Sequence, residues 1–229
     1  MSPETIHIVP SRRTAADELF SLLRADIESL RLTPGTKLSE ADVAKRYNVS
    51  RQPVREAFIR LGDISLVSIR PQKATTVARI SKSEIVKSRF IRLAIELEIA
   101  RTACLIYRGE LDDEIQAILD RQEQCAASTN FDHFRQLDYQ FHKLICKAAG
   151  REFAFQVIED CKVKVDRLCI LELSSKADAS QTLADHQEMF KHLKANNESG
   201  LVEATKKHLS RLDETIEANQ KKFSDFFEE

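Results

Sequence analysis

The sequence predicts a mainly α-helical protein with a small front domain followed by an antiparallel all-α bundle of six or seven helices. All five Pro residues lie before position 72, so a long proline-free stretch follows them. Apolar residues recur at helical spacing along most of the chain. Two short β-prone runs stand together between residues 66 and 78 and mark the end of the front domain.

Composition points to a soluble, folded protein. The chain has 229 residues, 42% of them apolar and 31% charged, which is ordinary for a globular protein. No apolar run is long enough for a spanning helix and no leader segment opens the chain, so we expect a cytoplasmic protein without membrane contact. Five widely spaced Cys without a CxxC pair favour reduced, buried thiols over a disulfide framework.

The front domain is expected over residues 12–79, after a flexible tail at 1–11. A helix begins near Arg12 and ends at the turn 33–35, Ser39 caps a second helix, and Ser50 caps a third that runs to about Leu61. The runs 66–69 and 75–78 then form a hairpin whose tip, 70–74, is basic. Helix, helix, turn, helix and hairpin make a winged helix-turn-helix domain.

The rest of the chain, 80–229, is expected to form the bundle. Ser81 to Glu84 is predicted to form a capping box at the start of a helix that ends at about Arg108. Further helices are predicted at roughly 110–128, 130–149, 151–173, 180–197 and 200–220, with a polar loop at 174–180. Charge divides the same way: residues 1–80 carry 13 Lys and Arg against 9 Asp and Glu, and the remainder carries 22 against 27.

A basic front domain of this shape favours DNA as partner. The third helix packs through one apolar face, and its first turns present polar side chains on the other side. A recognition helix places these N-terminal residues in the major groove, where the arginine fork fits guanine or phosphate. The hairpin tip can reach the DNA backbone. The candidate DNA-binding residues are Ser50, Arg51, Gln52, Arg55, Arg70, Gln72 and Lys73; the alternative is a small helical subdomain with surface arginines.

Four residues of the bundle suggest a metal site. Asp138 and His142 lie one helical turn apart within an apolar stripe, and His186 and His208 share the apolar registers of their own helices. One carboxylate and three imidazoles suit a divalent metal ion, with zinc as first candidate and nickel, manganese and iron as alternatives. The alternative is that these histidines are hydrogen-bonded core residues.

The sequence of the front domain resembles a known family. The segments 32–38 (LTPGTKL), 43–44 (VA) and 48–58 (NVSRQPVREAF) are similar to signatures of the GntR family of bacterial transcription regulators. The resemblance runs from about Ala15 to Ala78 and implies a homodimer on a palindromic double-stranded operator, with the third helix in the major groove. It departs from the family at Ala41, Ser65 and Ala74, which concerns the wing contacts. Glu56 is expected to pair with a cation of the same domain.

The bundle resembles the FCD effector domain of the FadR branch, from about Ser81 to Phe223. The resemblance depends on four segments: Arg92 to Glu96, Asp138 to His142, Asp185 to His186, and Lys207 to Leu209. It implies that Asp138, His142, His186 and His208 hold the metal and that a small carboxylate binds nearby. Such an anion needs a cation. Arg92 is the first candidate ligand-binding residue, with a structural pair to a carboxylate on a helix as its alternative, and Arg135 and Arg151 are the other candidates.

The sequence thus predicts a DNA-binding transcription regulator, of repressor type and not an enzyme, controlled by a small sugar acid or other organic acid at a metal-containing pocket. Two alternatives stay open. One is a metal-dependent hydrolase that uses the Asp and three His residues around an activated water. The other is a structural DNA-binding protein that senses nothing.

Overall fold

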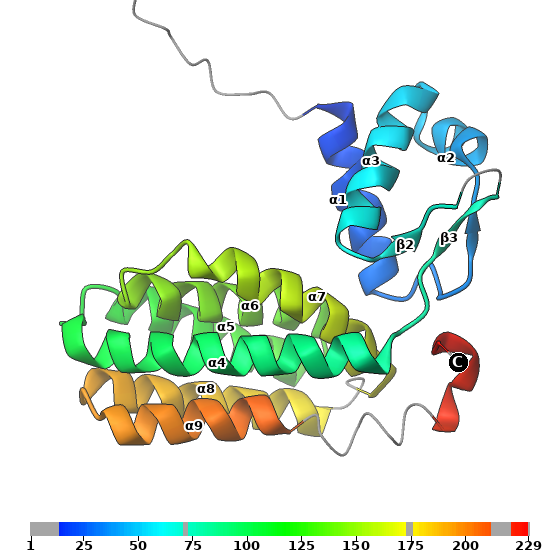
Figure 1. The fold of residues 1–229 in the computed structure, drawn as a ribbon. Helices are drawn as coiled ribbons and strands as arrows, with labels where there is room; N and C mark the ends of the chain where they lie inside the picture. Colours follow the sequence, from blue (N-terminus) through cyan, green and yellow to red (C-terminus); the bar gives the residue numbers. More distant parts are fainter. Residues whose placement is uncertain (1–13, 71–72, 173–175, 212–220, 229) are drawn as a thin grey trace, which may run out of the picture. The chain divides into compact units, whose positions relative to one another are not determined.

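The computed structural model describes residues 14–70, 73–172, 176–211 and 221–228, with side chains of α7 described up to residue 167 (Figure 1). The predicted tail at 1–11 and Gln72 lie outside the described residues. The chain divides into two compact units. The first contains the residues up to Ile27 and Gly35–Ala78, and the second contains Glu28–Pro34 and everything from Arg79. Each is described by itself.

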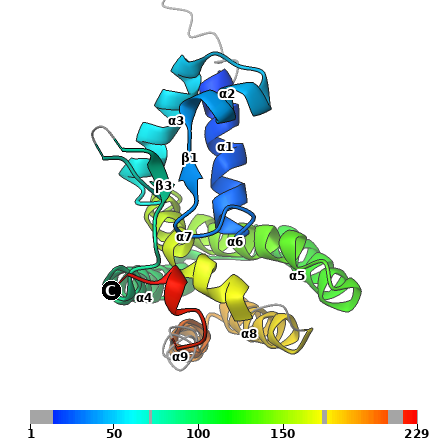
Figure 2. The same cartoon turned by 90° about the vertical axis from the view of Figure 1, so that its right-hand side faces the viewer.

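The first unit is the helix-turn-helix with its wing (Figure 2). Its elements are α1 (Ala15–Glu28), β1 (Lys37–Leu38), α2 (Glu40–Tyr47), α3 (Arg51–Asp63), β2 (Val67–Ser68) and β3 (Thr75–Val77). The strands form one antiparallel sheet in the order β1-β3-β2. The hairpin of β2 and β3 agrees with the sequence prediction, but β1 was missed because two residues are too few to show alternation.

Local chemistry sets the turn between α2 and α3. The Ser39 hydroxyl accepts a hydrogen bond from the Asp42 N–H at 3.4 Å and so caps α2 as predicted. Asn48 ends the helix in the left-handed conformation with φ 52°. Ser50 occupies the N-cap position of α3 in an extended conformation, but its side chain makes no capping bond. The hydroxyl of Ser50 is therefore not used by its own helix.

The second unit is the predicted helical bundle. Its helices are α4 (Lys82–Ile106), α5 (Asp112–Ser128), α6 (Phe131–Ala148), α7 (Ala154–Glu172), α8 (Lys176–Lys194) and α9 (Glu198–Ser210). α4 packs along α7 and α9, α5 packs along α6 and α8, and α8 packs along α9 (Figure 1). The mainly α-helical fold class is confirmed, and six helices of the described chain build the bundle.

Besides the predicted Ser50 cap, which does not form, two predictions about helix ends were wrong. Ser81 precedes α4, but no capping box forms, because its hydroxyl lies 3.1 Å from that of Ser83. Glu84 instead pairs with Lys87 at 2.8 Å and with Lys164 at 3.1 Å. The loop expected at 174–180 is shorter, since α8 already begins at Lys176. Of the helix expected to reach residue 220, the structure describes α9 to Ser210.

The end of the described chain packs on the start of the bundle. Ile80 donates a backbone hydrogen bond to the Phe226 carbonyl at 2.7 Å and accepts one from the Glu228 N–H at 3.0 Å. The side chains of Ile80, Ile85, Val165 and Phe227 form a small buried cluster. The segment that enters α4 is thereby fixed to the bundle surface.

Helix α4 carries polar residues on its buried side. Ser88, Arg92 and Glu96 are buried in the same helix as Ile85 and Ile99. Buried charges of this kind need partners, so the polar centre of the bundle begins on this helix. No helix among the described residues is long and apolar enough to cross a membrane.

Candidate metal centre and DNA-reading helix

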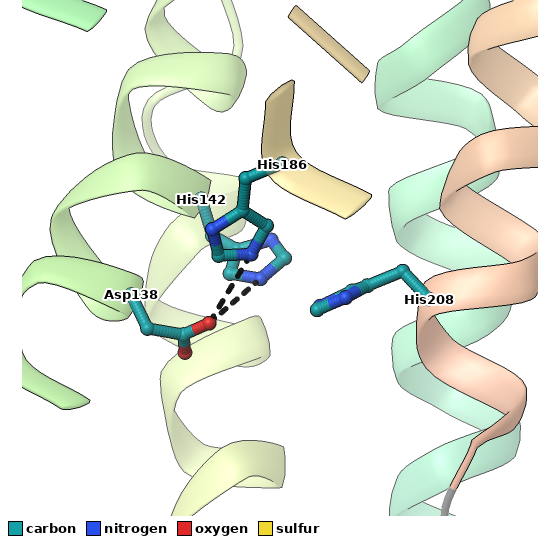
Figure 3. A group of neighbouring side chains, drawn as sticks. All are labelled: Asp138, His142, His186 and His208. Atoms are coloured by element: carbon teal, nitrogen blue, oxygen red, sulfur yellow. Dashed lines mark ion pairs between the residues drawn. The ribbon is translucent and has the colours of Figure 1, made fainter. Parts of the chain in front are cut away.

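Asp138, His142, His186 and His208 converge inside the bundle (Figure 3). Each offers one ligand atom, and these four atoms lie within 4.8 Å of one another. Asp138 and His142 stand one turn apart on α6, His186 comes from α8 and His208 from α9. The helical registers therefore bring together the four residues that the sequence singled out.

Each of the three histidine rings has its Nδ1 atom beside an acceptor. His142 Nδ1 lies 2.7 Å from Glu96 Oε2, His186 Nδ1 is hydrogen-bonded to Gln122 Oε1 at 3.0 Å, and His208 Nδ1 lies 3.5 Å from Asp185 Oδ2. Of these three contacts, the one between His186 Nδ1 and Gln122 is a hydrogen bond. A hydrogen bond at Nδ1 selects the tautomer that keeps its lone pair on Nε2, the nitrogen that can bind a metal. Sequence reasoning missed these three acceptors.

His186 gives the sharpest test of whether a cation fits. Its ring is fully buried and stacks on Phe141 with centroids 4.1 Å apart. Burial lowers the pKa of His186 to about 3, so the ring is neutral at neutral pH. With Nδ1 bonded to Gln122, its Nε2 has no hydrogen-bond partner among the described residues and lies 3.3 Å from Asp138 Oδ1. Two lone-pair acceptors that face each other at this distance suit a cation between them.

Charges around His142 are tightly paired. Arg92 Nε donates to Glu96 Oε1 at 2.5 Å, and Arg92 Nη2 lies 3.1 Å from His142 Nε2. Burial alone would lower the pKa of His142, but the neighbouring carboxylates of Glu96 and Asp138 outweigh it and raise that pKa. The predicted ligand-binding residue Arg92 thus reaches the edge of the cluster of Asp138 and the three histidines.

Lys162 on α7 is a second buried cation at this site, and the sequence analysis missed it. It is only 4% exposed. Its Nζ contacts Asp138 Oδ2 and lies 3.9 Å from Asp166 Oδ1. Burial would raise the pKa of Asp138, but the charge of Lys162 holds it well below its usual range. Asp138 is therefore ionised and ready to bind a cation.

The other predicted ligand-binding arginines lie elsewhere. Arg135 pairs with Asp132 one turn away on α6. Arg151 is exposed and donates to the Gly150 carbonyl at 3.1 Å. Neither makes a described contact with the four clustered residues. Their role in ligand binding stays a prediction.

The predicted DNA-reading residues lie together at the start of α3. Ser50, Arg51, Gln52 and Arg55 are all exposed, while Val54, Ala57, Phe58 and Leu61 are buried on the other side of the helix. Two of the exposed residues already have partners. Arg55 donates to both carboxylate oxygens of Glu40 at 3.1 and 3.0 Å, and Gln52 donates to Glu56 at 2.9 Å. The expectation that Glu56 pairs with a cation was wrong.

The wing keeps its basic tip. Arg70 and Lys73 are exposed, and the Lys73 N–H donates a hydrogen bond to the Arg70 carbonyl at 3.2 Å. Ser65, which stands where the resembled family usually has Gly, has φ 62°. This left-handed conformation is one that Gly adopts more readily, which accounts for the family preference at this position.

Comparison with known proteins agrees with this architecture. Residues 15–77 match the family model described as bacterial regulatory proteins, gntR family, and residues 89–211 match the FCD domain. The chain is 34% identical over 212 residues to the HTH-type transcriptional repressor RspR of Escherichia coli strain K12, covering 93% of both chains. It is 21% identical over 200 residues to the gluconate operon transcriptional repressor of Bacillus subtilis, covering 85% of this chain and 82% of that one. The solved structure of E. coli McbR/YncC has the same fold, with a TM-score of 0.76 at 19% identity, over 92% of this chain and 99% of that one.

A winged helix-turn-helix unit joined to a helical bundle with a buried polar centre is the architecture of a DNA-binding transcription regulator that carries a second domain. The matches place it within that class. The chain belongs to the GntR family of bacterial transcription regulators, and its bundle is an FCD domain.

Proposed function

We propose that this regulator holds a divalent metal ion at Asp138, His142, His186 and His208 and responds to a small carboxylate that binds beside the ion. The observation that carries the proposal is the unpartnered Nε2 of His186 facing the ionised Asp138 at 3.3 Å. Three imidazole nitrogens and one carboxylate oxygen are a donor set that zinc accepts, and that nickel, manganese and iron also accept. The ion would supply a positive charge to which a carboxylate oxygen binds.

Arg92 and Lys162 are the residues we propose for the remainder of the carboxylate ligand. Both are buried, and they approach the cluster from different helices, Arg92 beside His142 and Lys162 beside Asp138. An arginine fork and a lysine ammonium are strong donors to carboxylates. The ligand class is therefore a sugar acid or another small organic acid.

The DNA-binding part of the proposal places α3 in the major groove of a palindromic operator. Arg51, Gln52 and Arg55 would then contact base edges, and Ser50, whose hydroxyl α3 does not use, would contact a phosphate. Lys73, with its wing neighbours Arg70 and Gln72, would follow the DNA backbone. Since the 34% identical relative RspR is named a repressor, repression is the proposed outcome.

A palindromic operator requires two copies of α3, and the bundle offers a surface for a homodimer. Large apolar side chains are exposed along one face of α4, among them Phe90 at 73% and Leu105 at 66%. Monomeric proteins rarely expose so many large apolar side chains on one surface. We expect the wild-type protein to sediment as a dimer and the Phe90→Glu variant to shift toward monomer.

The hydrolase alternative needs a general base beside the ion. The neighbouring carboxylates are engaged elsewhere: Glu96 pairs with Arg92, Asp185 pairs with Arg211, and Asp166 accepts from the Tyr139 hydroxyl at 2.7 Å. No observation among the described residues therefore favours hydrolysis over sensing.

Thermal unfolding tests the proposal. The purified protein is melted with zinc, after chelation, and with a panel of acids that includes gluconate, succinate and acetate. We expect zinc to raise Tm and one acid to raise it further only when the metal is present, because a ligand that binds the folded state stabilises it. His142→Ala should abolish the zinc effect, whereas His133→Ala, on the same helix but outside the cluster, should keep it. A zinc effect that survives His142→Ala would overturn the proposed site.

A further inference from the structure

Glu40 pairs with Arg55, one of the two arginines in the first turns of α3. It is the first residue of α2, and both of its carboxylate oxygens accept from Arg55, at 3.1 Å from Nε and 3.0 Å from Nη2. The contact with Arg55 lowers the pKa of Glu40, and the charge of Arg51 adds to this effect. A carboxylate therefore stands on the very surface that we propose faces DNA.

Stability does not account for this pair. The Arg55 side chain is 59% exposed and the Glu40 side chain 33% exposed, and exposed ion pairs contribute little to folding. A carboxylate near the phosphate backbone also opposes DNA binding through charge repulsion. Its presence is better explained by an effect on the arginine than by an effect on the fold.

The geometry leaves the reading edge of Arg55 free. Glu40 binds the side edge of the guanidinium, made of Nε and one Nη2 proton, and among the described residues nothing contacts Nη1 or the second Nη2 proton. Those two groups form the end-on fork that matches O6 and N7 of guanine. Holding the side edge fixes the direction in which that fork points, and it reduces the rotamer freedom that binding must remove.

We propose that Glu40 is a specificity-determining residue that orients Arg55 for a guanine in each operator half-site and weakens binding to other sequences. This inference rests on the proposed function in one respect, namely that α3 enters the major groove. It assigns to Glu40 an indirect role, because the carboxylate acts through Arg55 and touches no base.

The test uses the full-length protein and random-sequence DNA duplexes, since the operator is unidentified. Rounds of selection with the wild type yield a preferred sequence, and each variant is then measured by fluorescence anisotropy on that duplex, on single-base variants and on a scrambled duplex. The variants are Glu40→Ala, Glu40→Gln and Arg55→Ala. Asp42→Asn is the matched control, because it removes an exposed carboxylate from the same first turn of α2.

We expect Glu40→Ala to lose about 3- to 10-fold of the discrimination for guanine at one position of each half-site. Its affinity for the scrambled duplex should stay unchanged or rise, because one negative charge has gone. Asp42→Asn should keep the full base preference. An equal loss of affinity on selected and scrambled duplexes, or an unchanged preference in Glu40→Ala, would overturn the role of Glu40.

Arg55→Ala separates this inference from the proposed function. If Arg55→Ala binds the selected duplex as the wild type does, α3 does not read DNA as proposed and both ideas fail. If Arg55→Ala loses the guanine preference while Glu40→Ala and Glu40→Gln retain it, the proposed function stands and the inference about Glu40 is wrong.

Discussion

The partner of His186 allows a quantitative prediction. Gln122 on α5 is fully buried, and its Oε1 accepts from His186 Nδ1 at 3.0 Å. The replacement Gln122→Met keeps the length of the side chain but removes this acceptor. Loss of a hydrogen-bonding partner behind a metal-bound histidine costs about 10- to 100-fold in metal affinity, or about 1.4–2.7 kcal/mol.

The free energy of unfolding without metal should change much less. Gln122→Met leaves the Nδ1–H of His186 without a partner, which costs about 1–3 kcal/mol. It also removes the buried Gln122 Nε2, which has no hydrogen-bond partner in the described part of the wild type, and this gain is of the same size. The two effects offset each other, so the variant should separate metal binding from folding.

Zinc titration followed by urea unfolding measures both quantities. At a free zinc concentration of about 100 times the wild-type Kd, zinc should stabilise the wild type by about 2.7 kcal/mol and the variant by only about 0.4–1.4 kcal/mol. Gln116→Met, on the exposed face of the same helix, should behave as the wild type. Equal zinc stabilisation of Gln122→Met and Gln116→Met would refute the argument that Gln122 orients a metal ligand.

Three further predictions concern the second unit. Phe227→Ala should lower the free energy of unfolding by about 3 kcal/mol, because its ring is 2% exposed in the cluster at the start of α4; a loss below about 1 kcal/mol in urea unfolding would show that this segment is not held there in solution. Burial opposes ionisation of Asp185, but contacts from His208 and Arg211 lower its pKa to about 2. The folded pKa of Asp185 lies below its unfolded value, so its ionised form adds about 2 kcal/mol to the free energy of unfolding above pH 4, and this contribution is lost as pH falls toward 2. The difference in free energy of unfolding between the wild type and Asp185→Asn should therefore shrink over that range. A constant difference would contradict the lowered pKa of Asp185. Burial raises the pKa of Cys146 to about 12, so iodoacetamide at pH 7 should leave it unmodified in the folded protein, as peptide mapping would show, and rapid modification would count against its burial.

Local signals made most of the fold predictable. The cap at Ser39 and the turn at Asn48 lie within α2 and its ends, so a few neighbouring residues determine them. The missed strand β1 depends instead on β3, which lies 37 positions further along the chain at the Leu38–Thr75 pair. A two-residue strand has no periodicity of its own, and only the tertiary contact reveals it.

The difference between local and long-range signals also holds for the cluster of Asp138, His142, His186 and His208. Asp138 and His142 share one helix, so their spacing alone placed them together. Glu96, Gln122 and Lys162 contact the cluster from three other helices, and one sequence does not give helix pairing. A signal for them did exist, because Arg92 and Glu96 lie four residues apart on the buried face of α4 between apolar residues.

The arrangement of the three histidines argues against a merely structural polar core. Replacing buried ionic groups by apolar ones commonly stabilises a protein, so a cluster of this size in the bundle needs another reason to be kept. A structural cluster would also have its hydrogen bonds satisfied on both ring nitrogens. His142 has contacts at both ring nitrogens, from Glu96 and Arg92, but the Nε2 of His186 faces an ionised carboxylate without a hydrogen bond among the described residues. The unpartnered nitrogen of His186 supports the proposed cation site, and the two buried cations Arg92 and Lys162 lie beside the same cluster.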